Sequence, residues 1–199
     1  MSNPFGADVD PDAVPDPMTL VRAWVGAPDR PLVMTLTTVG DDGAPDARHV
    51  HLFEVADEEI RFHTDARSRK AAQLRADARV TLAFFWPEPL RQLVVAGVAA
   101  SVPTATLDAD FARISRYLQV LSWVNDDALA ARPAGERREV LAAFEAAHPG
   151  PLARPEWWIG HSVRPHRVTF WRGDDAGPSN RLEYTRRPDG TWETTRLAG

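Results

Sequence analysis

The sequence predicts a mainly β protein whose antiparallel strands form a closed or half-closed barrel with helices at its flanks. Apolar, β-branched runs alternate with short turns rich in Gly, Pro and Asp, which is typical of hairpins. The strands follow one another with few helices between them, and this order favours a barrel over a parallel βαβ sheet. The nucleotide-binding motifs GxGxxG and GxxxxGK(S/T) are absent from the sequence.

The composition is that of one ordinary folded domain. Of the 199 residues, 44% are hydrophobic and 26% are charged, so wholesale disorder is excluded. There is no cysteine, which excludes disulfides, thiolate metal sites and cysteine nucleophiles. The net charge of -5 lacks the basic excess typical of nucleic-acid binding. No apolar run is long enough to span a membrane and no signal peptide is recognisable, so we expect a cytoplasmic protein.

The N-terminal half predicts an arm, a short helix and a series of strands. Residues 1–17 are rich in Pro, Asp and Ala and are expected to form a flexible arm. Apolar residues at helical spacing predict a helix over 18–27. Helix formers predict a second helix over 66–77, with Ser68 as its cap. The predicted strands are 32–39, 47–55, 59–64, 79–86 and 90–102.

The C-terminal half predicts two helices and three closing strands. An apolar face predicts a helix over 104–122, and a second helix over 135–148 is ended by Pro149-Gly150. We expect residues 18–199 to form a single domain. The predicted closing strands are 166–173, 181–187 and 191–198.

The first candidate site is Ser68-Arg69-Lys70 at the start of a predicted helix. Two cations, a hydroxyl and the free N–H groups of a helix N-terminus together favour an anion such as phosphate. A capped surface helix with a solvated basic turn explains the same residues. Arg48 lies within an apolar strand and needs a partner on its buried side, either a carboxylate or a ligand phosphate.

Polar and aromatic groups near the strand ends are further candidates. Gln92 carries a donor and acceptors that suit the edge of a heterocycle, although a Gln at a strand edge is more often solvated. Trp171 can cover a planar ring and Arg181 can bind its oxygen or nitrogen atoms, although Trp171 suits a protein core equally well.

Metal and hydrolase chemistry have little support. His49 and His51 share one strand face near His63, but no carboxylate of the hairpin completes a ligand set, so we expect no metal. Stacked or surface histidines are the simpler interpretation. The nucleophile motif Gly-x-Ser-x-Gly is absent.

The order of these groups along the chain resembles the pyridoxamine 5'-phosphate oxidase family. The resemblance runs from about residue 18 to residue 199. It is carried by SRKA at 68–71, by W-x-x-x-x-RQ ending at Gln92, and by the C-terminal segments RL-x-Y-x-R-R and W-x-x-x-RLA. The resemblance implies a split β-barrel and a homodimer that holds FMN in clefts between its two subunits.

The resemblance also implies a set of FMN ligands. Some match the family's ligands of the flavin phosphate, and the others match its contacts around the flavin ring. The first group is Arg48, Arg69 and Lys70, with His63 and Thr64 beside them, and the second is Gln92, Trp171 and Arg181.

The substrate side departs from the family pattern. The Lys that opens the family's substrate-phosphate pocket is Phe53 here, and an Arg-x-His segment before the last flavin Arg reads Gly177-Pro178-Ser179. The family's Tyr, Arg and Ser on the following helix are out of register, and Arg113 and Arg116 are their candidate substitutes. We therefore expect a retained cofactor site and a rebuilt substrate pocket. The candidate substrate contacts are Phe53, Arg113, Arg116 and Ser179.

The resemblance implies an FMN-dependent oxidoreductase that acts on a small substrate, aromatic or otherwise less anionic than a vitamer phosphate. Two alternatives stay open. One is a genuine pyridoxamine or pyridoxine 5'-phosphate oxidase that makes pyridoxal 5'-phosphate, and the other is a non-enzymatic flavin-binding protein. Because the flavin would carry the redox chemistry, no side chain is assigned as a catalytic acid or base.

Overall fold

The computed structural model describes residues 14, 16–26 and 32–198, and over these residues the chain forms one nine-stranded sheet. The main order of strands is β2-β1-β5-β6-β7-β4-β3, and β8 pairs with both β7 and β9. All neighbouring strands are antiparallel. Their bounds are β1 Val33–Val39, β2 Pro45–His51, β3 Glu54–Val55, β4 Ile60–Asp65, β5 Arg79–Trp86, β6 Arg91–Ser101, β7 Trp158–Arg172, β8 Asn180–Arg186 and β9 Trp192–Leu197.

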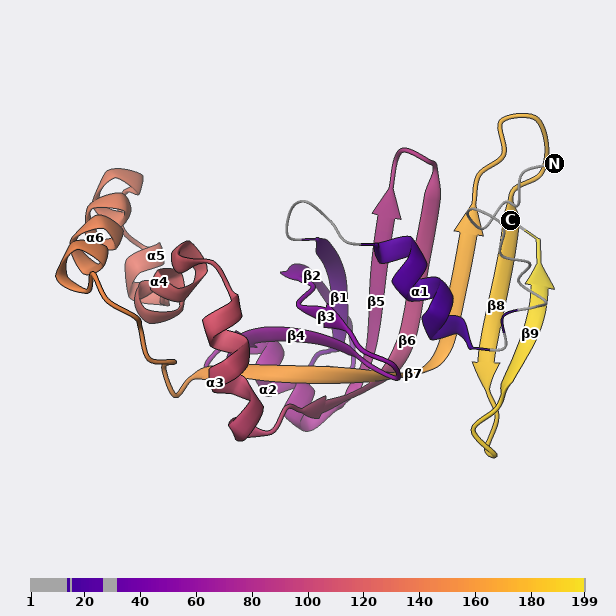
Figure 1. Ribbon diagram of the computed structural model, residues 1–199, viewed down its shortest axis with the longest axis horizontal. Coiled ribbons are helices and arrows are strands. Elements are labelled where there is room, and N and C mark those ends of the chain that lie inside the picture. Colours follow the sequence, from indigo (N-terminus) through magenta and orange to yellow (C-terminus); the bar gives the residue numbers. More distant parts are fainter. Residues whose placement is uncertain (1–13, 15, 27–31, 199) are drawn as a thin grey trace.

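The helices lie around this sheet, which curls into a half-barrel and confirms the predicted fold class (Figure 1). Figure 1 shows α4, α5 and α6 grouped beyond one end of β7, with α3 between them and the sheet and the β8-β9 hairpin at the other end. None of the described helices is long and apolar enough to cross a membrane. The helix bounds are α1 Pro17–Val25, α2 Arg69–Ala76, α3 Thr104–Arg113, α4 Arg116–Val124, α5 Asp127–Ala130 and α6 Ala134–Ala147.

Helix α1 is fixed at both ends and covers the core. Its N-cap Asp16 accepts a hydrogen bond from the N–H of Met18 at 3.0 Å, and Gly26 ends the helix at a φ of 62°, where glycine is favoured. Trp24 is buried and packs edge-to-face on Phe170 of β7, with ring centroids 5.0 Å apart. Residues 1–13 and 15 of the expected arm lie outside the described residues.

Strand β7 organises the sheet because it pairs with three other strands. Its first part pairs with β4, its last part with β8, and β6 runs beside most of its length. The register between β6 and β7 shifts at Ala96 and Gly97. A β-carbon at Gly97 would lie 2.6 Å from the carbonyl oxygen of Arg164, so the close approach of the two strands requires glycine.

Several predicted boundaries differ from the structure. The expected helix 104–122 is interrupted at Ile114, whose backbone is extended, so α4 begins anew after its cap Ser115. The expected strand 47–55 divides into β2 and β3. Strand β7 begins eight residues before the predicted 166 because Gly160 and Pro165 conceal its pattern, and the short helix α5 was not predicted.

We predict that Gly97→Ala destabilises the protein by about 1–3 kcal/mol, because the added methyl group meets the backbone of Arg164 and the side chain of Val163. Urea unfolding measures the change. Gly135→Ala on α6 is the matched control, since its added methyl group meets no atom within 4 Å. Equal stability of the two variants would contradict the role assigned to the close approach.

Candidate functional site

The candidate phosphate site lies where β2 meets the start of α2. Asp46, Arg48 and Val50 share the inner face of β2, as the alternation of its burial shows. The guanidinium of Arg48 donates to the hydroxyl of Thr38 at 2.6 Å and to the side-chain oxygen of Gln73 at 2.9 Å. It also pairs with the carboxylate of Asp46 at 2.8 Å. The partner that the sequence required for Arg48 is therefore, within this structure, an internal carboxylate.

Arg69 and Lys70 open helix α2 beside this network. The side chain of Arg69 is 78% exposed and reaches the carboxylate of Asp46 at 2.9 Å. Lys70 is half-buried, and among the described residues it makes no hydrogen bond or ion pair. Burial lowers the pKa of the Lys70 ammonium, and the nearby positive charges of Arg48 and Arg69 lower it further, whereas the carboxylate of Asp65 opposes the shift. Three cations around one helix start, one of them without a hydrogen bond or ion pair to a described residue, fit a phosphate group.

The predicted cap Ser68 occupies the N-cap position, but its side chain does not cap the helix. Its hydroxyl donates to the carbonyl oxygen of Asp65 at 2.7 Å and lies 3.4 Å from the hydroxyl of Thr64. The first N–H groups of α2 are consequently left without a side-chain acceptor from Ser68.

A cavity of about 790 Å³ begins where β4 leads toward this helix start. His63, Thr64 and Asp65 of β4 line it, so one strand end connects the cavity to the phosphate site. Most of the remaining wall is apolar, and much of it comes from the segment after β2, from Ile114 and helix α4, and from the loop before β7. Its apolar residues include Leu52, Phe53, Ile114, Leu118, Leu121 and Trp157.

Phe53 forms a wall of the cavity and is fixed by cations and by an aromatic ring. The guanidinium of Arg113 lies 4.6 Å from the centre of its ring, and that of Arg61 lies 5.6 Å away. The ring of His63 meets it edge-on at 4.4 Å. The structure thus brings together the predicted residues Phe53, His63 and Arg113.

Sequence reasoning missed a buried carboxylate beneath this wall. Asp110 is 2% exposed, and its side chain lies 3.1 Å from Arg61, 3.2 Å from Nε2 of His63 and 3.7 Å from Arg113. The sequence offers one sign of it: Asp110 lies three residues after the buried Leu107, on the apolar face of helix α3, where an acidic residue needs a partner. Asp110 compensates the positive charges gathered around the cavity wall.

Burial is the main cause that lowers the pKa of His63, to about 4 from its usual 6.5. Arg61 and His161 lower it further, whereas Asp110 opposes the shift. The ring also stacks on Trp158, with centroids 4.1 Å apart and an interplanar angle of 12°. His63 is therefore neutral at physiological pH.

The other predicted ring contacts form a row across three strands. Gln92 of β6 pairs with Trp171 of β7, and Trp171 pairs with Arg181 of β8. These three do not belong to the cavity wall. In sheet order β6 lies three strands from β2, which carries Arg48. Within one chain the row and the phosphate site are thus separate.

Two of the predicted substrate contacts also lie away from the cavity wall. Arg116 donates to the carbonyl oxygens of Gly150 and His148 and so joins the start of α4 to the segment after α6. Ser179 directly precedes β8. Their substrate roles stay predictions.

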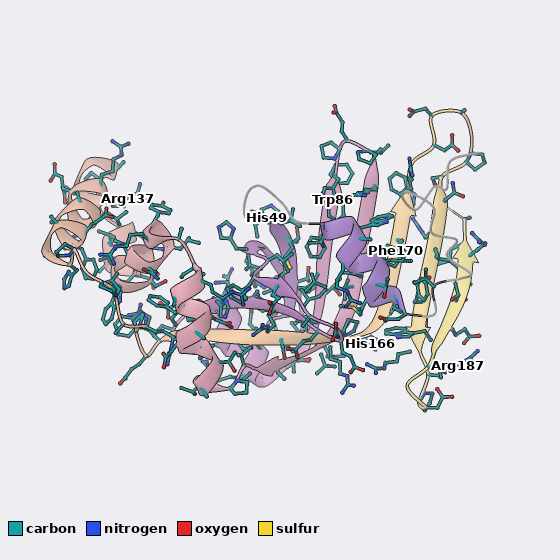
Figure 2. The ribbon with its side chains drawn as sticks, in the orientation of Figure 1. His49, Trp86, Arg137, His166, Phe170 and Arg187 are labelled. Carbon is teal, nitrogen blue, oxygen red and sulfur yellow. The ribbon has the colours of Figure 1, made fainter. Side chains whose placement is uncertain are left out.

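The histidines on the outer face of β2 serve other contacts. Nδ1 of His49, labelled in Figure 2, lies 3.2 Å from the hydroxyl of Thr35, and His51 lines the cavity. Within the described part of the chain, no group of three or more His, Asp or Glu side chains could hold a metal ion.

Comparison with known families accounts for nearly the whole chain. Residues 21–148 match the sequence model described as "Pyridoxamine 5'-phosphate oxidase". Residues 158–199 match the one described as "Pyridoxine 5'-phosphate oxidase C-terminal dimerisation region", which indicates a homodimer.

Curated relatives and solved structures agree with these matches. A "Pyridoxine/pyridoxamine 5'-phosphate oxidase" of a Nocardioides species is 36% identical over 94% of this chain and 90% of its own length. One from Chromobacterium violaceum is 34% identical over 94% of this chain and 90% of its own length. PhzG from Burkholderia lata 383, in complex with tetrahydrophenazine-1-carboxylic acid, superposes with a TM-score of 0.83 at 24% identity, over 96% of this chain and 98% of its own. An FMN-binding protein from Nostoc punctiforme superposes with a TM-score of 0.69 at 20% identity, over 84% and 88%.

We predict that the free energy of unfolding falls as the pH is lowered from about 6.5 to about 4. The unfolded chain takes up a proton at His63 near 6.5, but the folded protein does so only near 4. The loss is complete below the folded-state pKa and amounts to roughly 3 kcal/mol for this group.

Urea unfolding across this pH range measures the effect. His63→Gln should lose less stability than the unaltered protein, whereas His166→Gln, on the exposed part of β7 labelled in Figure 2, should lose as much. Parallel pH profiles for His63→Gln and the unaltered protein would show that His63 titrates normally.

Proposed function

Because the chain belongs to the pyridoxamine 5'-phosphate oxidase family, we propose that it is an FMN-dependent oxidoreductase acting on a small substrate that is aromatic or otherwise less anionic than a vitamer phosphate. The observation that carries this proposal is that the cavity and the cation cluster adjoin at the end of strand β4. Residues of β4 line the apolar cavity and lead directly to the cation cluster of α2.

The flavin phosphate is proposed to bind at Arg48, Arg69 and Lys70. Lys70 offers a half-buried ammonium that makes no hydrogen bond or ion pair with a described residue, and Arg48 is oriented by Thr38 and Gln73. The hydroxyl of Thr64 lies 3.4 Å from that of Ser68, the N-cap residue of α2, and Thr64 also lines the cavity. A flavin with its phosphate at α2 can therefore extend its ring toward the cavity. Bound FMN would take two electrons from the substrate and pass them to oxygen or to another acceptor.

The row of Gln92, Trp171 and Arg181 is proposed to meet the flavin ring from the second subunit. Two observations support this arrangement. The row lies apart from the phosphate site of its own chain, and two of its members belong to the segment matched by the dimerisation region. The flavin would then lie at the interface of the homodimer.

The cavity favours a substrate with little negative charge. Its two arginines are already compensated, because Arg113 pairs with Glu54 at 3.2 Å and Arg22 pairs with Asp57 at 3.6 Å. A phosphate dianion that left water for this cavity would lack a free cation. Phe53 and Trp157 offer flat apolar surfaces against which an aromatic ring can pack. The Burkholderia lata structure, whose ligand is a tricyclic compound, is consistent with this substrate class.

A vitamer phosphate oxidase is the second candidate function. It is favoured by the names of the curated relatives, which match more than nine-tenths of this chain at 34–36% identity. The two functions share the flavin site and differ in the substrate that reduces the flavin.

We predict that Arg69→Ala combined with Lys70→Ala weakens FMN binding about a hundredfold or more. Charge-assisted contacts to a phosphate contribute about 1.5–3 kcal/mol each. Quenching of flavin fluorescence by flavin-free protein measures the affinity. The matched control is Arg137→Ala with Arg138→Ala, which removes two cations from exposed positions of α6 (Arg137 is labelled in Figure 2). Unchanged FMN affinity in the Arg69→Ala, Lys70→Ala variant would show that the flavin phosphate does not bind at this site.

We predict that pyridoxamine 5'-phosphate and pyridoxine 5'-phosphate are poor substrates. Steady-state oxidation of both should be compared with that of an established family oxidase under the same conditions. Pyridoxine without its phosphate is the matched control, since it isolates the contribution of the dianion. Turnover of either vitamer phosphate within tenfold of the established enzyme would favour the second candidate function.

A further inference from the structure

The cation cluster of the proposed phosphate site already contains an anion. Oδ2 of Asp46 lies 2.8 Å from the guanidinium of Arg48 and 2.9 Å from Nε of Arg69. The side-chain amide of Gln73 donates to the same oxygen at 3.0 Å. One carboxylate oxygen thus receives three donors, which is the environment that a phosphate oxygen would need.

Asp46 is held in this place by the geometry of β2. It lies two residues before Arg48, so both side chains point from the same face of the strand toward α2. The hydrogen bond from the Gln73 amide lowers the pKa of the Asp46 carboxyl, and Arg48 and Arg69 lower it further. The carboxylate is consequently ionised at physiological pH.

The two arginines differ in their freedom to leave Asp46. The side chain of Arg48 is 19% exposed and is tied to Thr38, Gln73 and the carbonyl oxygen of Leu36. That of Arg69 is 78% exposed and has Asp46 as its ion-pair partner. An entering phosphate can therefore recruit Arg69 by rotation, but it meets Arg48 with the carboxylate still close by.

We propose that Asp46 is a built-in competitor for the flavin phosphate. In the flavin-free protein it holds Arg48 and Arg69 in position, and on binding it must give up part of these contacts to a second anion. The inference rests on the proposed FMN site. As a consequence, the ratio of the affinity for FMN to the affinity for riboflavin is smaller than it would be if the three cations had no carboxylate beside them.

The test removes the charge of Asp46 and compares two flavins. Asp46→Asn keeps the shape and one acceptor oxygen, so the cluster stays assembled while the competing charge is lost. The affinity for FMN should rise about tenfold, the equivalent of one charge-assisted contact. The affinity for riboflavin, which lacks the phosphate, should stay within twofold of that of the unaltered protein. Fluorescence quenching of each flavin by flavin-free protein gives both values.

The matched control is Asp77→Asn at the other end of α2, where the carboxylate pairs with Arg79 at 2.6 Å. It removes the same charge and should leave both affinities unchanged. Asp46→Ser serves as a second variant if the Asn variant does not fold, because it also removes the charge and retains an acceptor. Thermal melting is a second measurement that does not depend on flavin fluorescence. Asp46→Asn should lower the Tm of the flavin-free protein more than that of the FMN-saturated protein.

Each outcome decides between distinct claims. Unchanged or weaker FMN binding by the Asp46 variants, while the unaltered protein binds FMN, would overturn the competitor role and leave the FMN site intact. An equal gain for FMN and riboflavin would also overturn it, because the effect would not involve the phosphate. Failure of the unaltered protein to bind FMN would instead overturn the proposed function.

Discussion

The guanidinium of Arg48 joins the sheet to helix α2, and the position of the candidate phosphate site depends on it. It donates to Thr38 and to the backbone of β1 on one side and to Gln73 of α2 on the other. Moving this half-buried guanidinium would cost free energy, because a charged group would lose several partners at once. The start of α2, with Lys70 and Arg69, is therefore fixed relative to β2, and the strand end that leads into α2 lines the cavity.

Charge compensation gives the cavity its character. Asp110 is buried against Arg61, Arg113 and the neutral ring of His63, so its carboxylate offsets the positive charges of the two arginines beneath the Phe53 wall. The cavity surface is left mostly apolar. Cations therefore outnumber the carboxylate of Asp46 at the proposed phosphate site, whereas the arginines of the cavity wall are paired. This difference supports the proposal of a retained cofactor site and a rebuilt substrate pocket.

The sequence predicted the sheet well because its strands alternate strongly and its turns are rich in Gly, Pro and Asp. Local order also shows the cations Arg69 and Lys70 at the start of α2 and the lone Arg48 within β2, and their role as phosphate ligands stays a prediction. It did not reveal Asp46 as the partner of Arg48, although the two share one face of β2, because the Gln73 side chain that bonds to both comes from α2, further along the chain. Asp110 was missed for a similar reason: its two nearest partners, Arg61 and His63, come from β4, far along the chain. The break at Ile114 escaped prediction because apolar periodicity continues across it. Contacts between distant segments, rather than local propensity, decide these features.

The most direct test of the central claim is a crystal structure of the protein grown with FMN. We expect the phosphate within hydrogen-bonding distance of Arg48, Arg69 and Lys70, and the flavin ring directed toward the cavity lined by Phe53. Flavin bound with its phosphate away from the start of α2, or no flavin bound at a saturating concentration, would contradict the assignment.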